Sequence, residues 1–481
     1  MIQTDMTPIE KRAAFSLAGI FSLRMMGLFM ILPVFSLFAM DIEGATPVMI
    51  GLAIGIYGLT QALFQIPFGM MSDRFGRKPI IALGLVIFAI GSVVAATSDS
   101  MLGIIIGRAL QGSGAIAAAV MALAADLTRE EHRTRAMAVI GMSIGLSFTA
   151  SLVLGPLLNG LIGVPGIFWM TAVLAIGGIF VLKFAVPNPV HSTFHRDAEP
   201  VPGYFMNVLK DKQLQRLDFG IAALHIILTS TFIALPFALR DYAGLETANH
   251  WYVYFPVLLL SLAASIPFII IAEKKRRIKE VFVAAIVGIA IAQLGLVIFY
   301  DSLIGICLLL ACFFISFNTL EALLPSLIAK FSPADKKGTA MGVYSTSQFL
   351  GAFVGGLVGG AVYGWFGMPG VFFFCTLVAG AWFFVAKTME TPRFLANFML
   401  HVGDIPGDQV AKLEQDLRQV KGVAEALYVA EEGAAYLKVD NRELDGDALE
   451  QFVEEVDDSE LGSAESGEGA AGEAHKRVPQ S

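Results

Sequence analysis

Apolar runs of about 20 residues, each long enough to cross the roughly 30 Å hydrocarbon core of a bilayer, recur from the N-terminus to about residue 387. Runs of this length must be helical in lipid, because the backbone has to satisfy its own hydrogen bonds there. We therefore expect an all-α membrane protein with twelve transmembrane helices. The expected spans are 13–39, 47–71, 79–97, 101–125, 136–160, 165–187, 214–239, 251–272, 281–300, 303–329, 338–363 and 368–387.

The charges of the loops set the expected orientation. Loops that follow odd-numbered spans are acidic or neutral, and Arg240 is their only basic residue. Loops that follow even-numbered spans carry the basic clusters, which include Arg74, Arg77, Lys78, Arg129, Arg133, Arg135, Lys274, Lys275, Arg276, Arg277, Lys279, Lys336 and Lys337. Because basic loops stay on the cytoplasmic side, we expect a multi-pass protein of the cell inner membrane with both termini in the cytoplasm.

A polar stretch in the middle of the chain divides the spans six and six. This division predicts an N-terminal six-helix bundle over 1–187, a cytoplasmic interdomain linker over 188–213 and a C-terminal six-helix bundle over 214–390. Residues 136–160 align without gaps on residues 340–364, with seven of 25 positions identical. The alignment predicts two pseudo-repeated halves, and shared small-residue composition is the alternative explanation.

The loop after the second span has a specific pattern of glycines and charges. Glycines permit a tight turn and a close approach of neighbouring helices. Arg77 can pair with an acid at the cytoplasmic end of the fourth span, where Asp126 is the candidate, and Asp73 can sit at the positive N-terminus of the span that begins near Gly338. The residues of this pattern are Gly69, Asp73, Arg74, Gly76, Arg77 and Lys78, with Asp126 as the expected partner of Arg77.

This loop resembles motif A of the major facilitator superfamily, and the resemblance extends over residues 1 to about 390. Arg108, Gln111, Gly112 and Gly114 resemble motif B of the family. Gly145, Gly155 and Pro156 resemble motif C, which is associated with proton-coupled antiporters. The resemblance implies alternating access by two rocking six-helix halves. It also implies that motif A is a conformational latch of the outward-open state, formed by Gly69, Asp73, Arg74, Gly76, Arg77, Lys78 and Asp126. The second half departs from the pattern, because residues 272–279 lack the glycines and the Asp-Arg pair.

Ionisable and polar side chains at bilayer depth are candidate sites, because their burial is costly unless they are paired or wetted. We expect Arg108, Glu321 and His225 to serve proton coupling, since removal from water favours the protonated form of a carboxyl group. The alternatives are that Glu321 neutralises an arginine, that Arg108 only braces neighbouring helices through hydrogen bonds, and that a neutral His225 is satisfied by a backbone carbonyl. The predicted substrate cavity is lined by Arg24, Tyr57, Gln61, Gln65, Gln111 and Asn318, and the glutamines are otherwise helix–helix contacts.

The region after Pro392 is a different kind of polypeptide. From Leu395 onward it holds 20 acidic and 7 basic residues. Its pattern of strands and amphipathic helices predicts a small α+β ferredoxin-like cytoplasmic domain over 395–456, followed by a disordered acidic tail over 457–481. The loop over 403–408 has no Cys-x-x-Cys pair, so we expect no metal transfer. The domain is either regulatory, with its own interaction partner, or a passive appendage.

These features predict a proton-coupled secondary transporter that exports a small organic compound. The alternatives are a transporter-derived sensor that signals through the C-terminal domain and a proton symporter for uptake. We expect no enzyme activity, cofactor, metal or nucleic-acid partner, because no nucleophile, metal-ligand or phosphate-binding pattern is present. The expected partners are a small-molecule substrate, protons and the lipid bilayer, and we expect a monomer.

Overall fold

The computed structural model describes residues 5–188, 202–333, 336–392, 396–403, 405–430, 433–440 and 443–452. Within these residues, ten helical segments are long and apolar enough to cross a bilayer. The helices that form them are α1 (Pro8–Phe29), α2 (Leu32–Met40), α3 (Pro47–Phe75), α4 (Arg77–Ala96), α5 (Met101–Ser113), α6 (Ala117–Asp126), α7 (Glu130–Phe184), α9 (Lys212–Phe237), α10 (Trp251–Lys274), α11 (Ile278–Phe299), α12 (Leu303–Phe331) and α13 (Lys337–Lys387). The short helix α8 (Phe205–Lys210) precedes α9.

Two of the ten segments account for the difference from the twelve expected spans. Helices α7 and α13 each extend over more than 50 residues, about 75 Å of helix, and each contains a glycine with non-helical backbone angles. These glycines, Gly163 (φ 67°) and Gly367 (φ 65°), are each followed two residues later by a proline. Gly163 and Gly367 are separated by the same number of residues as the aligned segments 136–160 and 340–364. The interruptions therefore recur at one position of the expected repeat.

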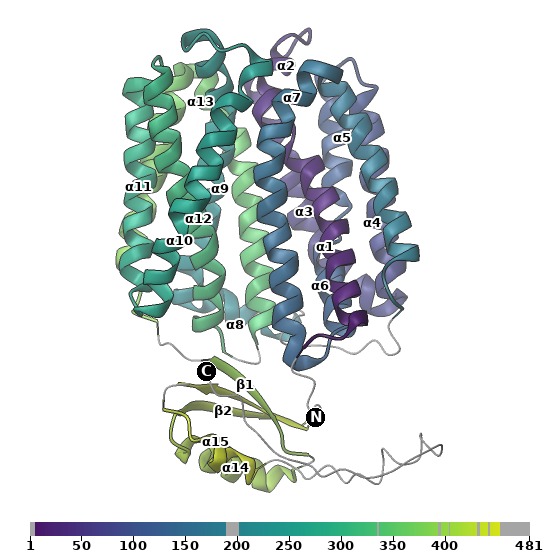
Figure 1. The fold of residues 1–481 in the computed structure, drawn as a ribbon, viewed down its shortest axis with the longest axis vertical. Coiled ribbons are helices and arrows are strands. Elements are labelled where there is room, and N and C mark those ends of the chain that lie inside the picture. Colours follow the sequence, from purple (N-terminus) through teal and green to yellow (C-terminus); the bar gives the residue numbers. More distant parts are fainter. Residues whose placement is uncertain are drawn as a thin grey trace. The chain divides into compact units, whose positions relative to one another are not determined.

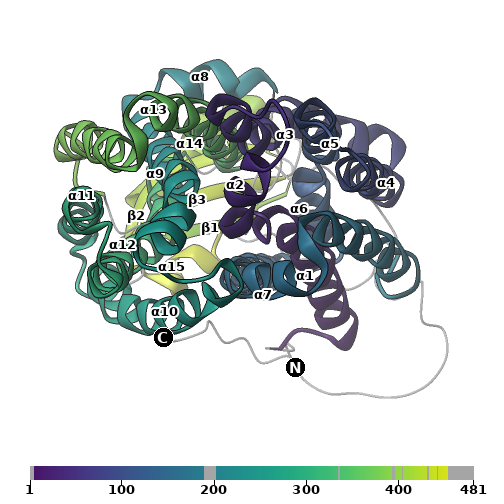
Figure 2. The ribbon, with the colours of Figure 1, turned by 90° about the horizontal axis from the view of Figure 1, so that it is seen from above.

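We call residues 6–188 the N-terminal half of the bundle and residues 202–392 the C-terminal half. Figures 1 and 2 show the helices of the N-terminal half, in purple and blue, side by side with those of the C-terminal half, in teal and green. The first part of α7 packs against α1 and α10, and the first part of α13 packs against α9 and α3. Each of these two helices thus contacts the first helix of its own half and a helix of the other half, as the repeat predicts.

The bundle has two ends that differ in loop charge. We call the end at which α3 stops and α4 starts the basic end, and the end at which α2 stops and α3 starts the acidic end. At the acidic end the halves approach closely: a side chain on Gly51 of α3 would overlap the Gly356 carbonyl of α13. The Ser36 hydroxyl donates to the Phe232 carbonyl across the same boundary at 3.1 Å. Midway along the helices, Phe148 of α7 stacks on Phe317 of α12 at 5.7 Å between ring centroids.

The outer surface of the bundle is apolar. Large side chains such as Leu259, Ile304 and Phe384 are 56%, 75% and 70% exposed. An apolar surface that follows helix after helix would not be stable in water. The bundle is therefore built to be surrounded by lipid.

The described residues between 396 and 452 belong to a separate compact unit. Its elements are β1 (Ala396–His401), α14 (Gly407–Gln419), β2 (Val423–Val429), β3 (Ala434–Val439) and α15 (Gly446–Glu450). The antiparallel strands lie in the order β1-β3-β2, and both helices cover one face of the sheet (Figure 1). Leu417, Leu437 and Leu449 form its core. Strands and helices are both present, as expected of an α+β unit, while residues 453–481, which include the expected tail, lie outside the described residues.

Candidate functional site

Arg77 is the centre of the predicted latch. Its Nε atom lies 3.2 Å from Asp126 Oδ2 at the end of α6, and its Nη1 atom donates to Ser72 Oγ at 2.9 Å. It also forms an ion pair with Asp73, one helical turn earlier in the chain. Both the Arg77 and the Asp126 side chains are almost fully buried, so this ion pair joins α4 to α6 at the basic end.

The other latch residues shape the turn between α3 and α4. Gly76 has φ 92°, a conformation that side chains rarely tolerate. A side chain on Gly69 would press against Ala118 of α6. Lys78 donates to the Val186 carbonyl and to Asn188 Oδ1, each at 2.6 Å, and Arg74 lies over the Phe75 ring. The glycines thus permit the turn that brings Arg77 to Asp126.

Asp73 lies elsewhere than at the N-terminus of α13. Its side chain is 40% exposed, and within the described part of the chain no hydrogen bond or ion pair connects it to α13. Helices α3 and α13 approach most closely around Gly51 and Gly356, on the acidic side of the bundle. The expected contact of Asp73 with the start of α13 is therefore absent from this conformation, and Asp73 contacts Arg77 of its own half instead.

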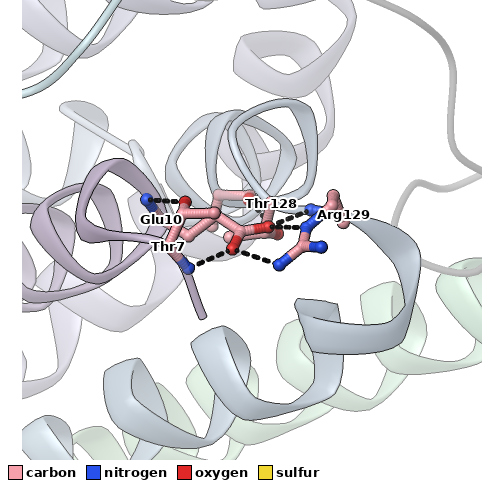
Figure 3. A network of polar contacts seen from close by, with 5 residues as sticks. Thr7, Glu10, Thr128 and Arg129 are labelled. Carbon is pink, nitrogen blue, oxygen red and sulfur yellow. Dashed lines mark hydrogen bonds and ion pairs between the residues drawn. The ribbon is translucent and has the colours of Figure 1, made fainter. Parts of the chain in front are cut away.

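Glu10 ties the start of α1 to the start of α7, as Figure 3 shows. Its carboxylate accepts hydrogen bonds from the Arg129 backbone N–H at 2.8 Å, from Arg129 Nε at 3.0 Å and from the Thr7 backbone N–H at 2.7 Å. The Glu10 backbone N–H in turn donates to the Thr7 hydroxyl, which completes a capping box. Sequence analysis missed Glu10. The Thr-x-x-Glu pattern would have predicted the cap, but not the distant partner Arg129.

Buried polar side chains form a second group inside the N-terminal half. Arg24 of α1 donates to Gln61 of α3, and Arg108 of α5 donates to Gln111 Oε1 at 2.7 Å and to the Ala53 carbonyl at 3.3 Å. The two guanidinium groups lie over the ring of Tyr57, at 5.7 Å and 5.1 Å from its centroid. We call Arg24, Tyr57, Gln61, Arg108 and Gln111 the arginine cluster; all five were predicted to line the cavity or to serve coupling.

The two remaining cavity residues are placed differently. Gln65 lies one turn beyond Gln61 on α3 and is buried, with no hydrogen bond to its Oε1 atom in the described residues. Asn318 is half-buried on α12, in the C-terminal half. The structure therefore brings five of the predicted residues together around Tyr57 and places Asn318 outside that group.

Glu321 and His225 form a pair in the C-terminal half. Glu321 Oε1 of α12 lies 3.3 Å from His225 Nε2 of α9, and the Glu321 side chain is 30% exposed. His225 Nδ1 lies 3.2 Å from the Ile221 carbonyl, which can only accept, so Nδ1 carries a proton. Nε2 can accept from the Gln348 amide of α13 as an unprotonated nitrogen, and it can form a hydrogen bond with Glu321 when a second proton lies on the imidazole or on the carboxyl group. The pair is thus arranged to share one proton, and no arginine contacts Glu321 in the described residues.

Further groups surround this pair. The Gln348 amide of α13 reaches His225 Nε2 at 2.9 Å. Tyr344 of α13 lies near Glu321 and Asp218, and Asp218 Oδ1 is buried without a hydrogen-bond partner in the described residues. Sequence analysis missed Asp218, because it lies near the expected start of its span, where carboxylates are common.

The glycines of the third motif have different surroundings. A side chain on Gly155 would overlap the Met30 carbonyl, at the break between α1 and α2. Pro156 follows inside α7. Gly145 faces open space, so close packing in this conformation does not require a glycine there. Gly155 is therefore the position at which α7 and α1 must approach closely.

The C-terminal half carries its own ion pair at the basic end. Glu273 of α10 pairs with Lys330 of α12 at 2.9 Å and accepts from Ser326 at 2.5 Å. In the N-terminal half, α6 precedes the long helix α7 and supplies the acid of its ion pair, Asp126. In the C-terminal half, α12 precedes the long helix α13 and supplies the base, Lys330. The two halves therefore use different charge arrangements, as the missing motif in the second half predicts.

Comparison with known proteins identifies the class. Residues 17–326 and 279–397 match the Major Facilitator Superfamily, and the chain belongs to this family of membrane transporters. The chain is 48% identical over 456 residues to the inner membrane transport protein YajR of Escherichia coli, a match that covers 94% of this chain and 99% of that protein. An uncharacterized transporter of Buchnera aphidicola (subsp. Baizongia pistaciae) is 33% identical and covers 78% of this chain and 95% of its own length.

Solved structures share the fold at low sequence identity. A bacterial homologue of the human lysosomal transporter Spinster, in an inward-facing and occupied conformation, has a TM-score of 0.65 at 14% identity and covers 80% of this chain and 98% of its own. The human organic anion transporter MFSD10 has a TM-score of 0.59 at 20% identity and covers 79% of this chain and all of its own. These similarities establish the fold of the bundle.

Proposed function

We propose that this transporter is proton-coupled and exports a small organic compound by alternating access. In this proposal α7 and α13 each cross the membrane twice, turning at Gly163 and Gly367, which gives twelve spans and places the basic end and both termini in the cytoplasm. The protein acts as a monomer, and the unit after Arg393 is a ferredoxin-like regulatory domain. The strand order β1-β3-β2 supports that assignment.

The observation that carries the proposal is the Glu321–His225 pair. Its two side chains lie on two helices of the C-terminal half at a distance that allows them to share a proton, and the Glu321 side chain is 30% exposed. A partly exposed carboxyl group beside a proton-accepting neighbour is suited to load and release a proton. The resemblance of Gly155 and Pro156 to motif C favours antiport over symport.

The contacts between the halves support one state of the cycle. The halves join at the acidic end, through Gly51 with Gly356 and Ser36 with Phe232, and Asp73 is not engaged with α13. We assign this conformation to the inward-facing state, in which the ion pairs of Arg77 are formed but Asp73 does not contact α13. In the other state, Asp73 would lie at the N-terminus of α13, where the helix dipole stabilises a carboxylate by about 1 kcal/mol.

The test uses the full chain in proteoliposomes that contain a proton-sensitive dye, with a counterflow screen to find a substrate. We expect substrate-dependent proton movement in the opposite direction to the substrate, and its loss in Glu321→Gln. Glu280→Gln, at an exposed position on α11, is the matched control and should retain it. Proton movement in the same direction as the substrate would establish uptake by symport, and an unchanged pH dependence in Glu321→Gln would remove Glu321 from the mechanism.

A further inference from the structure

We infer that the arginine cluster of the N-terminal half is a binding site for a small organic anion. The inference rests on the proposed transport function and names the class of substrate. The cluster holds two positive charges. Arg24 is 1% exposed and Arg108 is fully buried, and among the described residues no carboxylate pairs with either. Two buried cations that share one tyrosine ring repel each other, and burying each of them away from water is costly unless a counter-charge is present.

The unused hydrogen-bond atoms of the cluster are almost all donors. Arg24 Nε and Nη1, Arg108 Nη2 and Gln61 Nε2 are buried without an acceptor in the described protein. The hydroxyl of Tyr57, whose ring lies near both guanidinium groups, also has no partner there. The Gln61 and Gln111 carbonyl oxygens already accept from the arginines and leave these donors unsatisfied. A group of donors with two positive charges fits a ligand that supplies several acceptor oxygens and negative charge, as a carboxylate does.

A purely structural role explains the cluster less well. Stacking on Tyr57 and Phe88 stabilises a desolvated guanidinium group by about 2 kcal/mol, which is less than the several kcal/mol that burying an unpaired charge costs. An arginine that only holds helices together should donate several hydrogen bonds from its planar guanidinium group to backbone carbonyls. Arg108 makes one such bond, to Ala53, and Arg24 makes none in the described residues. The carboxyl groups of the C-terminal half do not serve as counter-ions, since Glu321 pairs with His225 instead.

The site is covered from the other half of the bundle. Phe349 of α13 packs against the cluster of Tyr57 and Phe88 and is itself only partly buried. A side chain on Gly58, beside Tyr57 on α3, would overlap the Phe349 carbonyl. Rotation of the Phe349 side chain, or movement of α13 relative to α3, therefore uncovers the Tyr57 edge and admits a ligand. Binding at this place would couple the anion to the relative position of the two halves.

The test compares three ligands with one ring and different charges: benzoate, benzamide and benzylammonium. Each is added to the full-length protein in detergent at pH 7 and constant ionic strength, and thermal unfolding is recorded against ligand concentration. We expect benzoate alone to raise the Tm, with at least a tenfold weaker apparent affinity in Arg24→Gln and in Arg108→Gln. Arg240→Gln, an exposed arginine paired with Asp241 at the acidic end, is the control and should bind benzoate normally.

Two milder variants keep the test decisive if an arginine variant fails to fold. Tyr57→Phe keeps the ring and removes only the hydroxyl, and it should weaken benzoate binding severalfold. Arg108→Lys keeps the charge and removes the planar fork, and it should also weaken binding severalfold. Phe349→Ala should speed benzoate association, measured by stopped-flow.

The inference is overturned if the three ligands change the Tm equally, or if sodium sulfate raises the Tm as much as benzoate does. It is also overturned if benzoate has no effect on the Tm at about 50 mM, where even millimolar affinity would give near-saturation. Because the assay contains no proton gradient, it is independent of the coupling experiment. Benzoate binding without coupled transport would uphold the site and contradict the proposed function. Coupled transport without benzoate binding would do the reverse.

Discussion

Arg77 Nε lies 3.2 Å from Asp126 Oδ2, and both side chains are almost completely buried at the basic end of the N-terminal half. Asp73, which pairs with the same arginine, is 40% exposed. The two carboxylates therefore differ in their contribution: Asp126 neutralises a buried cation in this conformation, whereas Asp73 is available to a partner on another helix.

This difference predicts opposite phenotypes for the two isosteric variants. Asp126→Asn should lower the free energy of unfolding by about 3 kcal/mol, because it removes the charge that compensates a buried arginine. Asp73→Asn should leave the protein folded and inserted but abolish transport. Thermal unfolding in detergent and counterflow in proteoliposomes measure the two effects. Normal transport in Asp73→Asn would contradict its role in the latch.

The Glu10 network gives a second stability prediction. Glu10→Ala removes the capping-box partner of Thr7 and the acceptor for the N–H group at the start of α7. The loss should be on the order of 2 kcal/mol, seen as a lower Tm. Glu280→Ala is the control, because the Arg277–Glu280 pair is exposed on both sides at 3.8 Å and should contribute little. Equal Tm values for the two variants would show that the contacts of Glu10 are not structural.

Local patterns in the sequence predicted the apolar helices to within a few residues. They also paired Arg77 with Asp126, because each of these residues lies at the end of an expected helix. The sequence also identified the members of the arginine cluster, since charges at bilayer depth are rare. It missed Arg129 as the partner of Glu10 and Phe349 as the cover of Tyr57. These are contacts between residues far apart in the chain, and helix packing selects them from many chemically equivalent candidates.

The close approach of α3 and α13 makes a prediction about conformation. Gly51→Ala adds a methyl group that would overlap the Gly356 carbonyl, so the halves should separate at the acidic end. Gly141→Ala is the matched control, because a methyl group there meets no other atom. Spin labels on Glu43→Cys and Glu246→Cys, at exposed acidic-end positions in the two halves, report the separation by pulsed electron resonance. We expect longer distances in Gly51→Ala alone, and unchanged distances would show that this contact does not hold the acidic end closed.

Within the C-terminal unit, Tyr428 connects β2 to the loop after β1. Its hydroxyl donates to the Gly403 carbonyl at 2.8 Å and accepts from the Ile405 backbone N–H at 3.0 Å. Tyr428→Phe should destabilise this unit by about 1 kcal/mol, because two partly buried backbone groups lose their partner. Hydrogen exchange of the β2 amides in the full chain should then be faster, while Glu425→Gln, at an exposed position on the same strand, should leave it unchanged.

Substrate counterflow with the same variant distinguishes the two roles considered for the domain. Unchanged transport in Tyr428→Phe is expected of a passive appendage, and altered transport with an intact membrane bundle is expected of a regulatory domain.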